Sequence, residues 1–191
     1  HASTGNLVAQ IHHGAPFHLF LAADLEYPRA LISGGEADPE SLVIFAHGSL
    51  VLWPKPTQTD WVTVLRSPEV RRIAVANPDT APYGTAARIA LQEAGLYEEL
   101  ASRLVTGENV AQTLQFVHSG NADYGLIAAS LLTAAHDLGP ALPIDLGPEA
   151  LPHGAILLTH REKSATAQQF LDWLSSKDAQ NILLKHGYRL P

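Results

Sequence analysis

Residues 73–84 read Ile73-Ala74-Val75-Ala76-Asn77-Pro78-Asp79-Thr80-Ala81-Pro82-Tyr83-Gly84, and this stretch decides the fold class. Its apolar run, residues 73–76, predicts a short strand buried inside a sheet. The residues that follow are dense in turn formers and predict a loop. Apolar side chains spaced along residues 87–94 then predict a helix that Gly95 ends. A buried strand that turns directly into a helix is typical of an α/β protein.

The same alternation of apolar strands and helices continues over the rest of the chain, and it predicts parallel, doubly wound sheets. The predicted strands are residues 17–22 (buried on both faces), 42–53 (two strands or one bent strand), 73–76, 124–129, 144–146 and 155–159. The predicted helices are residues 6–13, 25–33, 60–66, 85–94, 109–120, 131–136, 165–175 and 178–186. In the last two helices, the predicted apolar face consists of Phe170, Trp173, Leu174, Ile182 and Leu183.

Composition excludes several classes of protein. Hydrophobic residues make up 46% and charged residues 16% of the 191 residues, a balance typical of a compact α/β protein. The net charge is -7 and no cluster of Lys and Arg is present, so no nucleic-acid surface is expected. There are no cysteines, which excludes disulfides and thiolate metal sites. Apolar runs such as residues 49–53 are too short to cross a bilayer, so no membrane insertion is expected.

Three turns of small or polar residues lead directly into the N-terminus of a predicted helix. They are residues 3–5 (Ser-Thr-Gly), 81–84 (Ala-Pro-Tyr-Gly) and 108–110 (Glu-Asn-Val). The first turn of a helix has unpaired N–H groups and the positive end of the helix dipole. Several such ends meeting at one point would hold a dianion without Lys or Arg. Each turn by itself is better explained by ordinary helix capping.

Five segments, in order along nearly the whole chain, resemble the periplasmic molybdate-binding proteins of ABC importers, which have the type II periplasmic-binding-protein fold. Residues 9–11 (Ala-Gln-Ile) and 14–24 (Gly-Ala-Pro-Phe-His-Leu-Phe-Leu-Ala-Ala-Asp) are similar to the family pattern QI-x-x-GAP-x-D-x-F-x-SAD, with His18 and Ala22 replacing the usual Asp and Ser. Residues 50–53 resemble its crossover strand and residues 73–84 its second binding loop. The last matches are residues 108–110, a further binding turn, and 186–188, the family's ending.

The resemblance implies two α/β lobes, with residues 1–46 plus 153–191 in lobe I and residues 47–152 in lobe II. It implies that Thr4 gives a hydroxyl and a backbone N–H to the ligand, and that Tyr83 and Val110 each give a backbone N–H. Ser3 flanks the first of these contacts. The expected ligand is a tetrahedral oxyanion, molybdate or tungstate, with no cofactor. The expected partner is an ABC transporter permease.

The N-terminus leads to two further expectations. The chain begins at His1 without Met and shows no signal peptide, although the resemblance implies a periplasmic location. In the family, a strand, a loop with further ligand contacts and a helix precede the position of His1. We therefore expect that N-terminal sequence is missing from this chain.

Two other functions stay open at this point. The first is the ligand-sensing domain of a transcription regulator with the same fold, and the second is a sulfate-type binding protein, because neutral donors suit sulfate as well. No enzyme is expected, since no acid–base pair lies at the three turns and no G-x-S-x-G sequence occurs. No metal-cation site is expected either, because the ten histidines lack ligand spacing.

Overall fold

The computed structural model describes residues 2–134, 138–159 and 164–191. It divides into two compact units: unit 1 is His1–Gly48 with Glu149–Pro191, and unit 2 is Ser49–Pro148. Each unit has its own sheet, with helices on both faces. The two units are described separately below.

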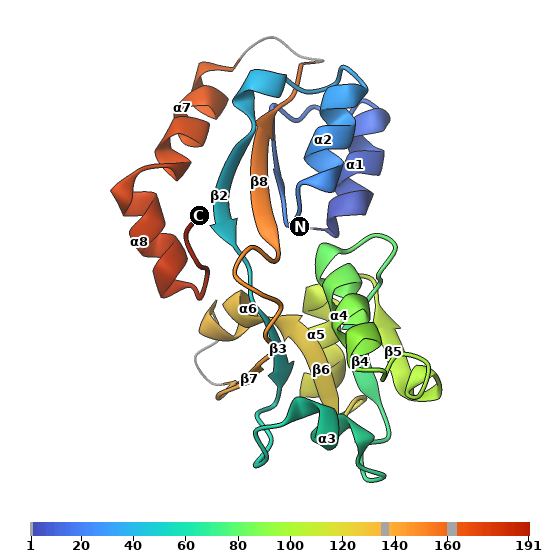
Figure 1. Cartoon of the computed structure of the whole chain (residues 1–191). Coiled ribbons are helices and arrows are strands. Elements are labelled where there is room, and N and C mark those ends of the chain that lie inside the picture. The colour runs from blue at the N-terminus through green and yellow to red at the C-terminus, as the bar shows by residue number, and fades with distance from the viewer. Residues whose placement is uncertain (1, 135–137, 160–163) are drawn as a thin grey trace. The chain divides into compact units, whose positions relative to one another are not determined.

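Unit 1 contains a three-stranded sheet in the order β1-β8-β2, covered by helices on both faces (Figure 1). Helices α1 and α2 pack on one face through a cluster that includes Val8, Phe20 and Leu31, and α7 and α8 pack on the other through Phe45 and Leu171. The elements are α1 (Thr4–His12), β1 (Leu19–Ala22), α2 (Glu26–Ser33), η1 (Pro39–Ser41), β2 (Val43–His47), β8 (Pro152–Leu157), α7 (Ala165–Leu174) and α8 (Lys177–Lys185).

The strand pairing in unit 1 differs from the prediction of a parallel sheet. Both β1 and β2 pair antiparallel to β8, so they run in the same direction on either side of it. The chain reaches β8 from residue 149, after the whole of unit 2, and the local sequence of a strand does not determine its direction. The prediction that β1 is buried on both faces is also wrong, because Leu21 is 39% exposed.

The apolar face predicted for the last two helices is only partly correct. Leu171, Leu174 and Ala179 are the buried residues of α7 and α8. Phe170, Trp173 and Ile182 are instead exposed, and the Phe170 and Trp173 rings lie 5.5 Å apart on the outer surface of α7. Helical periodicity identifies an apolar stripe but does not decide which edge of that stripe meets the sheet.

Unit 2 contains a five-stranded mixed sheet in the order β5-β4-β6-β3-β7. Strand β4 pairs parallel to β5 and to β6, whereas β3 pairs antiparallel to β6 and to β7. The elements are β3 (Leu50–Trp53), α3 (Trp61–Arg66), β4 (Ile73–Ala76), α4 (Pro82–Glu93), η2 (Ala101–Arg103), β5 (Leu104–Gly107), α5 (Val110–His118), β6 (Tyr124–Ala128), α6 (Ala129–Ala134) and β7 (Leu142–Pro143).

The order of β5, β4 and β6 places helices on both faces of this sheet. The chain moves from β4 through α4 to β5 and then returns through α5 to β6 on the far side of β4. Because both crossovers are expected to be right-handed, this reversal puts α4 and α5 on opposite faces. The α5 face is closed by Ala74, Val117 and Ile127.

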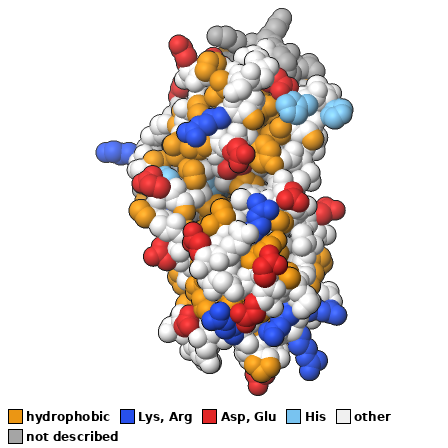
Figure 2. All heavy atoms as spheres, turned by 45° about the vertical axis from the view of Figure 1, so that its right-hand side comes forward, with side chains coloured by type: hydrophobic (Ala, Val, Ile, Leu, Met, Phe, Trp, Pro, Cys, Tyr) orange, Lys and Arg blue, Asp and Glu red, His pale blue; other side chains and the backbone are white. Residues whose placement is uncertain are grey.

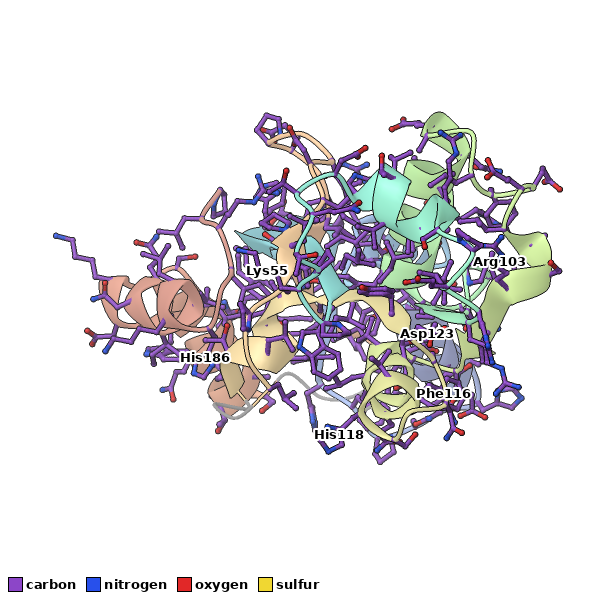
Figure 3. The ribbon with its side chains drawn as sticks, turned by 90° about the horizontal axis from the view of Figure 1, so that it is seen from below. Lys55, Arg103, Phe116, His118, Asp123 and His186 are labelled. Atoms are coloured by element: carbon purple, nitrogen blue, oxygen red, sulfur yellow. The ribbon has the colours of Figure 1, made fainter. Side chains whose placement is uncertain are left out.

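Two side chains fix the segment that leads into β4. The Asp123 carboxylate accepts hydrogen bonds from the N–H groups of Arg71 and Arg72 at 2.7 and 2.8 Å. The Arg103 guanidinium donates to the carbonyl oxygens of Leu65, Ser67 and Val70 at 3.1–3.4 Å. Figure 3 shows Arg103 and Asp123 at this end of the unit. The Asp123 and Arg103 side chains therefore fix the start of β4. The other end of this strand leads into the loop of residues 77–81.

Between β2 and β7, some element boundaries lie close to the predicted ones and others are shifted. Residues 42–53 form two strands, and Asp60 caps α3 by accepting hydrogen bonds from Val62 and Thr63. The strand predicted at 144–146 lies instead at Leu142–Pro143, where Leu142 pairs with Leu52, and only the N–H of Ile144 continues the pairing, to Leu50. The helix predicted at 131–136 begins at Ala129, and its last two predicted residues lie outside the described residues.

Candidate functional site

The carboxyl ends of β4 and β5 lie next to each other in unit 2, and each leads into a helix. The register pairs Ala76 with Gly107, and the N–H of Asn77 donates to the carbonyl oxygen of Gly107 at 2.7 Å. Tyr83 follows β4 in the first turn of α4, and Val110 follows β5 as the first residue of α5. The fold thus brings these two predicted residues to one edge of one sheet, as expected for neighbouring parallel strands.

The start of α4 lies against the end of β4, and this requires a residue without a side chain at position 84. A Cβ atom on Gly84 would lie 2.4 Å from the carbonyl oxygen of Ala76 and 2.6 Å from that of Asn77. The Thr85 hydroxyl donates to the Pro78 carbonyl oxygen at 2.7 Å and closes the loop from the other side. The N-cap residue, Ala81, gives no side-chain hydrogen bond to the helix.

The start of α5 is held by reciprocal hydrogen bonds. Asn109 accepts from the N–H of Gln112 at 3.0 Å, and the Gln112 side chain accepts from the N–H of Glu108 at 2.6 Å. These bonds leave the N–H of Val110 and the next N–H, at Ala111, without a hydrogen-bond partner among the described residues. The N-x-x-Q pattern at 109–112 is a capping-box signal that could have identified this arrangement from the sequence.

Ser3 and Thr4 belong to unit 1, where they begin α1. Ser3 is the N-cap residue and Thr4 the first helical residue, and both residues are buried, with 4% and 6% exposure. The Ser3 hydroxyl makes no cap hydrogen bond, and it has no hydrogen-bond partner in the part of the chain that the structure describes. A buried hydroxyl without a partner is uncommon in a folded protein, because it loses its hydrogen bonds to water. It therefore marks this helix start as a candidate ligand contact.

The first turns of α1, α4 and α5 contain no acidic residue. In contrast, Glu26 lies in the first turn of α2 and Asp178 in that of α8. A carboxylate in the first turn would neutralise the helix dipole and repel an anion, so its absence keeps these three starts suited to anions. On the face shown in Figure 2, Lys and Arg side chains are interspersed with Asp and Glu, so no broad basic patch attracts anions there.

Asp24 lies between β1 and the start of α2. Its Oδ1 accepts a hydrogen bond from the N–H of Tyr27 at 2.9 Å, so it acts as a cap. Burial raises the pKa of this carboxyl group above its usual range. Its Oδ2 is buried without a hydrogen-bond partner among the described residues.

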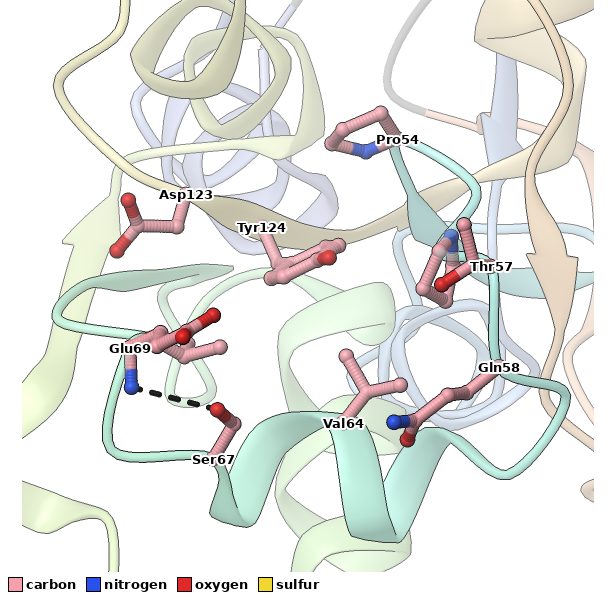
Figure 4. Close-up of a pocket in the computed structure, with 10 residues that line it drawn as sticks. Pro54, Thr57, Gln58, Val64, Ser67, Glu69, Asp123 and Tyr124 are labelled. Atoms are coloured by element: carbon pink, nitrogen blue, oxygen red, sulfur yellow. Dashed lines mark hydrogen bonds between the residues drawn. The ribbon is translucent and has the colours of Figure 1, made fainter.

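One cavity of about 370 Å³ lies at the other end of the strands of unit 2, where β4 and β6 begin (Figure 4). The Tyr124 ring and Val64 line it together with the carboxylates of Glu69 and Asp123, and the N–H of Glu69 donates to the Ser67 hydroxyl at 3.3 Å. Two carboxylates and no Lys or Arg among its lining residues make it unsuited to an oxyanion.

Neither a metal-cation site nor a membrane-spanning helix is found among the described residues. Within residues 2–134, 138–159 and 164–191, no group of three or more His, Asp or Glu side chains is placed to hold a metal ion. His136 and His160 lie outside the described residues. None of the helices in those ranges combines the length and the apolar character that crossing a membrane requires.

Comparisons with known proteins consistently find bacterial solute-binding proteins. Residues 1–189 match the family model for bacterial extracellular solute-binding proteins. The molybdate-binding protein ModA of Azotobacter vinelandii is 38% identical over 193 residues, which cover 98% of this chain and 76% of that protein. The ModA protein of Rhodobacter capsulatus is 35% identical over 187 residues, which cover 97% of this chain and 74% of that protein.

A solved structure shows the same relationship. The periplasmic molybdate-binding protein of Azotobacter vinelandii matches the fold with a TM-score of 0.90 at 34% identity, over 100% of this chain and 85% of that one. The predicted α/β fold of the periplasmic-binding-protein type is thereby confirmed, as is the predicted family.

Proposed function

The chain belongs to the bacterial extracellular solute-binding proteins, and we propose that it captures a tetrahedral oxyanion, molybdate or tungstate, for delivery to an ABC permease. Relatives that are 35% and 38% identical are named molybdate-binding proteins, and a structural match that is 34% identical is named periplasmic. These names favour binding and transport over enzymatic activity, and they favour a periplasmic location. They also disfavour the regulator and the sulfate-type protein as alternatives.

This proposal rests on hydrogen-bond donors that lie at the starts of helices and have no partner among the described residues. In the described residues, the Val110 N–H and the Ser3 hydroxyl have no hydrogen-bond partner, and neither helix has an acid in its first turn. Hydrogen bonds to a charged acceptor contribute about 1.5–3 kcal/mol each, so five or six suffice for sub-micromolar affinity after association costs. A fully deprotonated dianion fits such a site, because every ligand oxygen can accept.

We propose that Ser3, Thr4, Tyr83 and Val110 all donate to the same anion. In this proposal, Thr4 contributes its hydroxyl and N–H, Tyr83 and Val110 contribute N–H groups, and Ser3 contributes its hydroxyl. We assign residues 1–46 plus 153–191 to lobe I and residues 47–152 to lobe II. The division of the chain into two contact units supports this assignment. No cofactor is required, because the site only has to bind.

Titration calorimetry with molybdate, tungstate, sulfate and phosphate tests the proposed function. Molybdate or tungstate should bind with sub-micromolar affinity, and sulfate should bind at least about tenfold more weakly. Phosphate should bind weakest, since its proton needs an acceptor. Tightest binding of sulfate would overturn the choice of ligand and leave the fold assignment intact. A helix-turn-helix sequence encoded directly upstream would instead favour the regulator.

A further inference from the structure

A second cavity in unit 2 lies beside α4, at the edge of the sheet where β5 is the outermost strand. Its volume is about 370 Å³, which is within the range of small-molecule sites. Val75 from β4, Leu91 from α4 and Leu104 from β5 supply apolar walls, and Val75 and Leu91 are buried. The Tyr97 ring, which is half-buried, adds an aromatic wall. An apolar body of the size of a single ring therefore fits inside.

One cationic side chain, that of Arg88, is among the residues that line this cavity. The Arg88 side chain is 35% exposed, and its ion-pair partner is Asp79, at 3.6 Å. That partner is 81% exposed, so the pair is long, hydrated and weak. Arg88 has five N–H donors in a planar fork, and one distant carboxylate oxygen leaves most of this capacity available for another anion.

From these features we infer that the cavity is a second ligand site, for a small monocarboxylate with an apolar or aromatic body. The ligand carboxylate would pair with the Arg88 guanidinium in two-point geometry, and its body would lie against Leu91, Leu104 and Tyr97. An inorganic oxyanion would leave the apolar walls unused, and a neutral apolar molecule would leave most of the guanidinium donors unused. This site does not depend on the oxyanion function, although Asn77, in the loop before α4, and Gly84, next to Tyr83 in the first turn of α4, also line it.

Benzoate is a suitable probe, with benzamide as its uncharged counterpart of nearly the same shape. Titration of the whole chain, followed by calorimetry and by the NMR signals of Arg88 and Tyr97, should show benzoate binding with a Kd between about 10 µM and 1 mM. Benzamide should bind at least about tenfold more weakly, because it lacks the charge. Equal binding of the two probes would overturn the proposal. So would the absence of benzoate binding at a concentration 10 times the upper end of this Kd range.

Two variants test the position of the site. Arg88→Gln should weaken benzoate binding at least about tenfold. The matched control Arg66→Gln, which removes an exposed arginine paired with Glu99, should leave it unchanged. Thr106→Phe should also block binding, because Thr106 lines the cavity and the larger Phe side chain would fill it. Thr106 is an exposed residue of the edge strand β5, and Phe is favoured in strands, so the variant should still fold. Unchanged benzoate affinity in Arg88→Gln, with circular dichroism confirming a folded protein, would overturn the site.

A third variant removes the competing anion. Asp79→Asn should strengthen benzoate binding about two- to fivefold, because Asp79 is the carboxylate that pairs with Arg88. Weaker binding in this variant would show that Asp79 does not compete with the probe for Arg88, which contradicts the proposal.

Discussion

The N–H of Asn77 donates to the carbonyl oxygen of Gly107 at 2.7 Å, and this hydrogen bond joins the two loops that follow β4 and β5. It extends the parallel pairing of the strands by one residue beyond the Ala76–Gly107 pair. The starts of α4 and α5 are therefore held in a fixed relation by the sheet itself. A site made of backbone N–H groups needs such a fixed base, because the backbone cannot adopt rotamers to reach a ligand.

Val110→Pro should lower oxyanion affinity without unfolding the protein. Proline removes the N–H that is proposed to bind the ligand, and it is well tolerated at the first position of a helix. Asn109 has φ -156° and ψ 172°, a conformation compatible with a following proline. Calorimetry should show a loss of about 10- to 100-fold in molybdate affinity. Val110→Ala, which keeps the N–H, is the control, and an equal loss in both variants would indicate a side-chain contact instead.

Ser3→Ala should weaken oxyanion binding about tenfold or more while leaving the ligand-free protein equally stable or up to about 1 kcal/mol more stable. The Ser3 hydroxyl is buried and has no partner among the described residues, so its removal leaves no bond unmade in the absence of ligand. Stability is measured by urea denaturation without ligand.

Ser176→Ala serves as the matched control for Ser3→Ala. Ser176 caps α8 by accepting a hydrogen bond from the N–H of Ala179 at 3.2 Å. Its removal should cost about 1 kcal/mol of stability and leave affinity unchanged. If Ser3→Ala behaves like Ser176→Ala, the Ser3 hydroxyl is a structural cap and not a ligand contact.

Gly84→Ala should destabilise unit 2 by about 2–4 kcal/mol and reduce oxyanion binding, because the new methyl group would overlap two backbone carbonyl oxygens. Backbone cannot move aside as a flexible side chain can, so α4 would have to shift away from β4. Gly34→Ala is the control, since the nearest atoms to its added Cβ lie 3.4 Å or more away. Chemical denaturation and calorimetry of both variants check this prediction, and a stable Gly84→Ala protein with full affinity would contradict it.

His153 should make stability depend on pH between about 6.5 and 4. Burial lowers the pKa of His153 to about 4, with His47 adding a smaller effect, while the Leu151 carbonyl oxygen at 2.9 Å acts in the opposite direction. The unfolded chain takes up a proton near pH 6.5 and the folded protein only near pH 4, so stability falls as the pH decreases across this window. The change amounts to about 3 kcal/mol over the window.

His153→Phe isolates this contribution. The His153 ring packs edge-on against Phe45 and Tyr188, with centroids 6.0 and 5.3 Å away, and a phenyl ring can adopt the same packing. Urea denaturation at pH 7 and pH 4.5 should show a clearly smaller loss of stability for the variant than for the original protein. An identical pH dependence would show that other groups control it.

Several features of the fold and the site could be read from local sequence. Strand β4 lies where the apolar run of residues 73–76 predicts it, and α3 lies within the helix predicted at residues 60–66. Ordinary helix capping, which was expected at each of the three turns, occurs at Asn109, whereas Ser3 begins α1 without a side-chain cap hydrogen bond. These features depend on interactions between residues a few positions apart, which a single segment contains in full.

The tertiary structure decided the rest. It set β8 antiparallel to β1 and β2, exposed Phe170 and Ile182, and shaped the cavity beside Arg88. It also left the Ser3 hydroxyl buried without a partner among the described residues and joined Asn77 to Gly107. Each of these outcomes depends on which distant segments pack together. Composition and periodicity determine that an apolar face will be buried, but long-range packing determines what it is buried against and which polar atoms are left for a ligand.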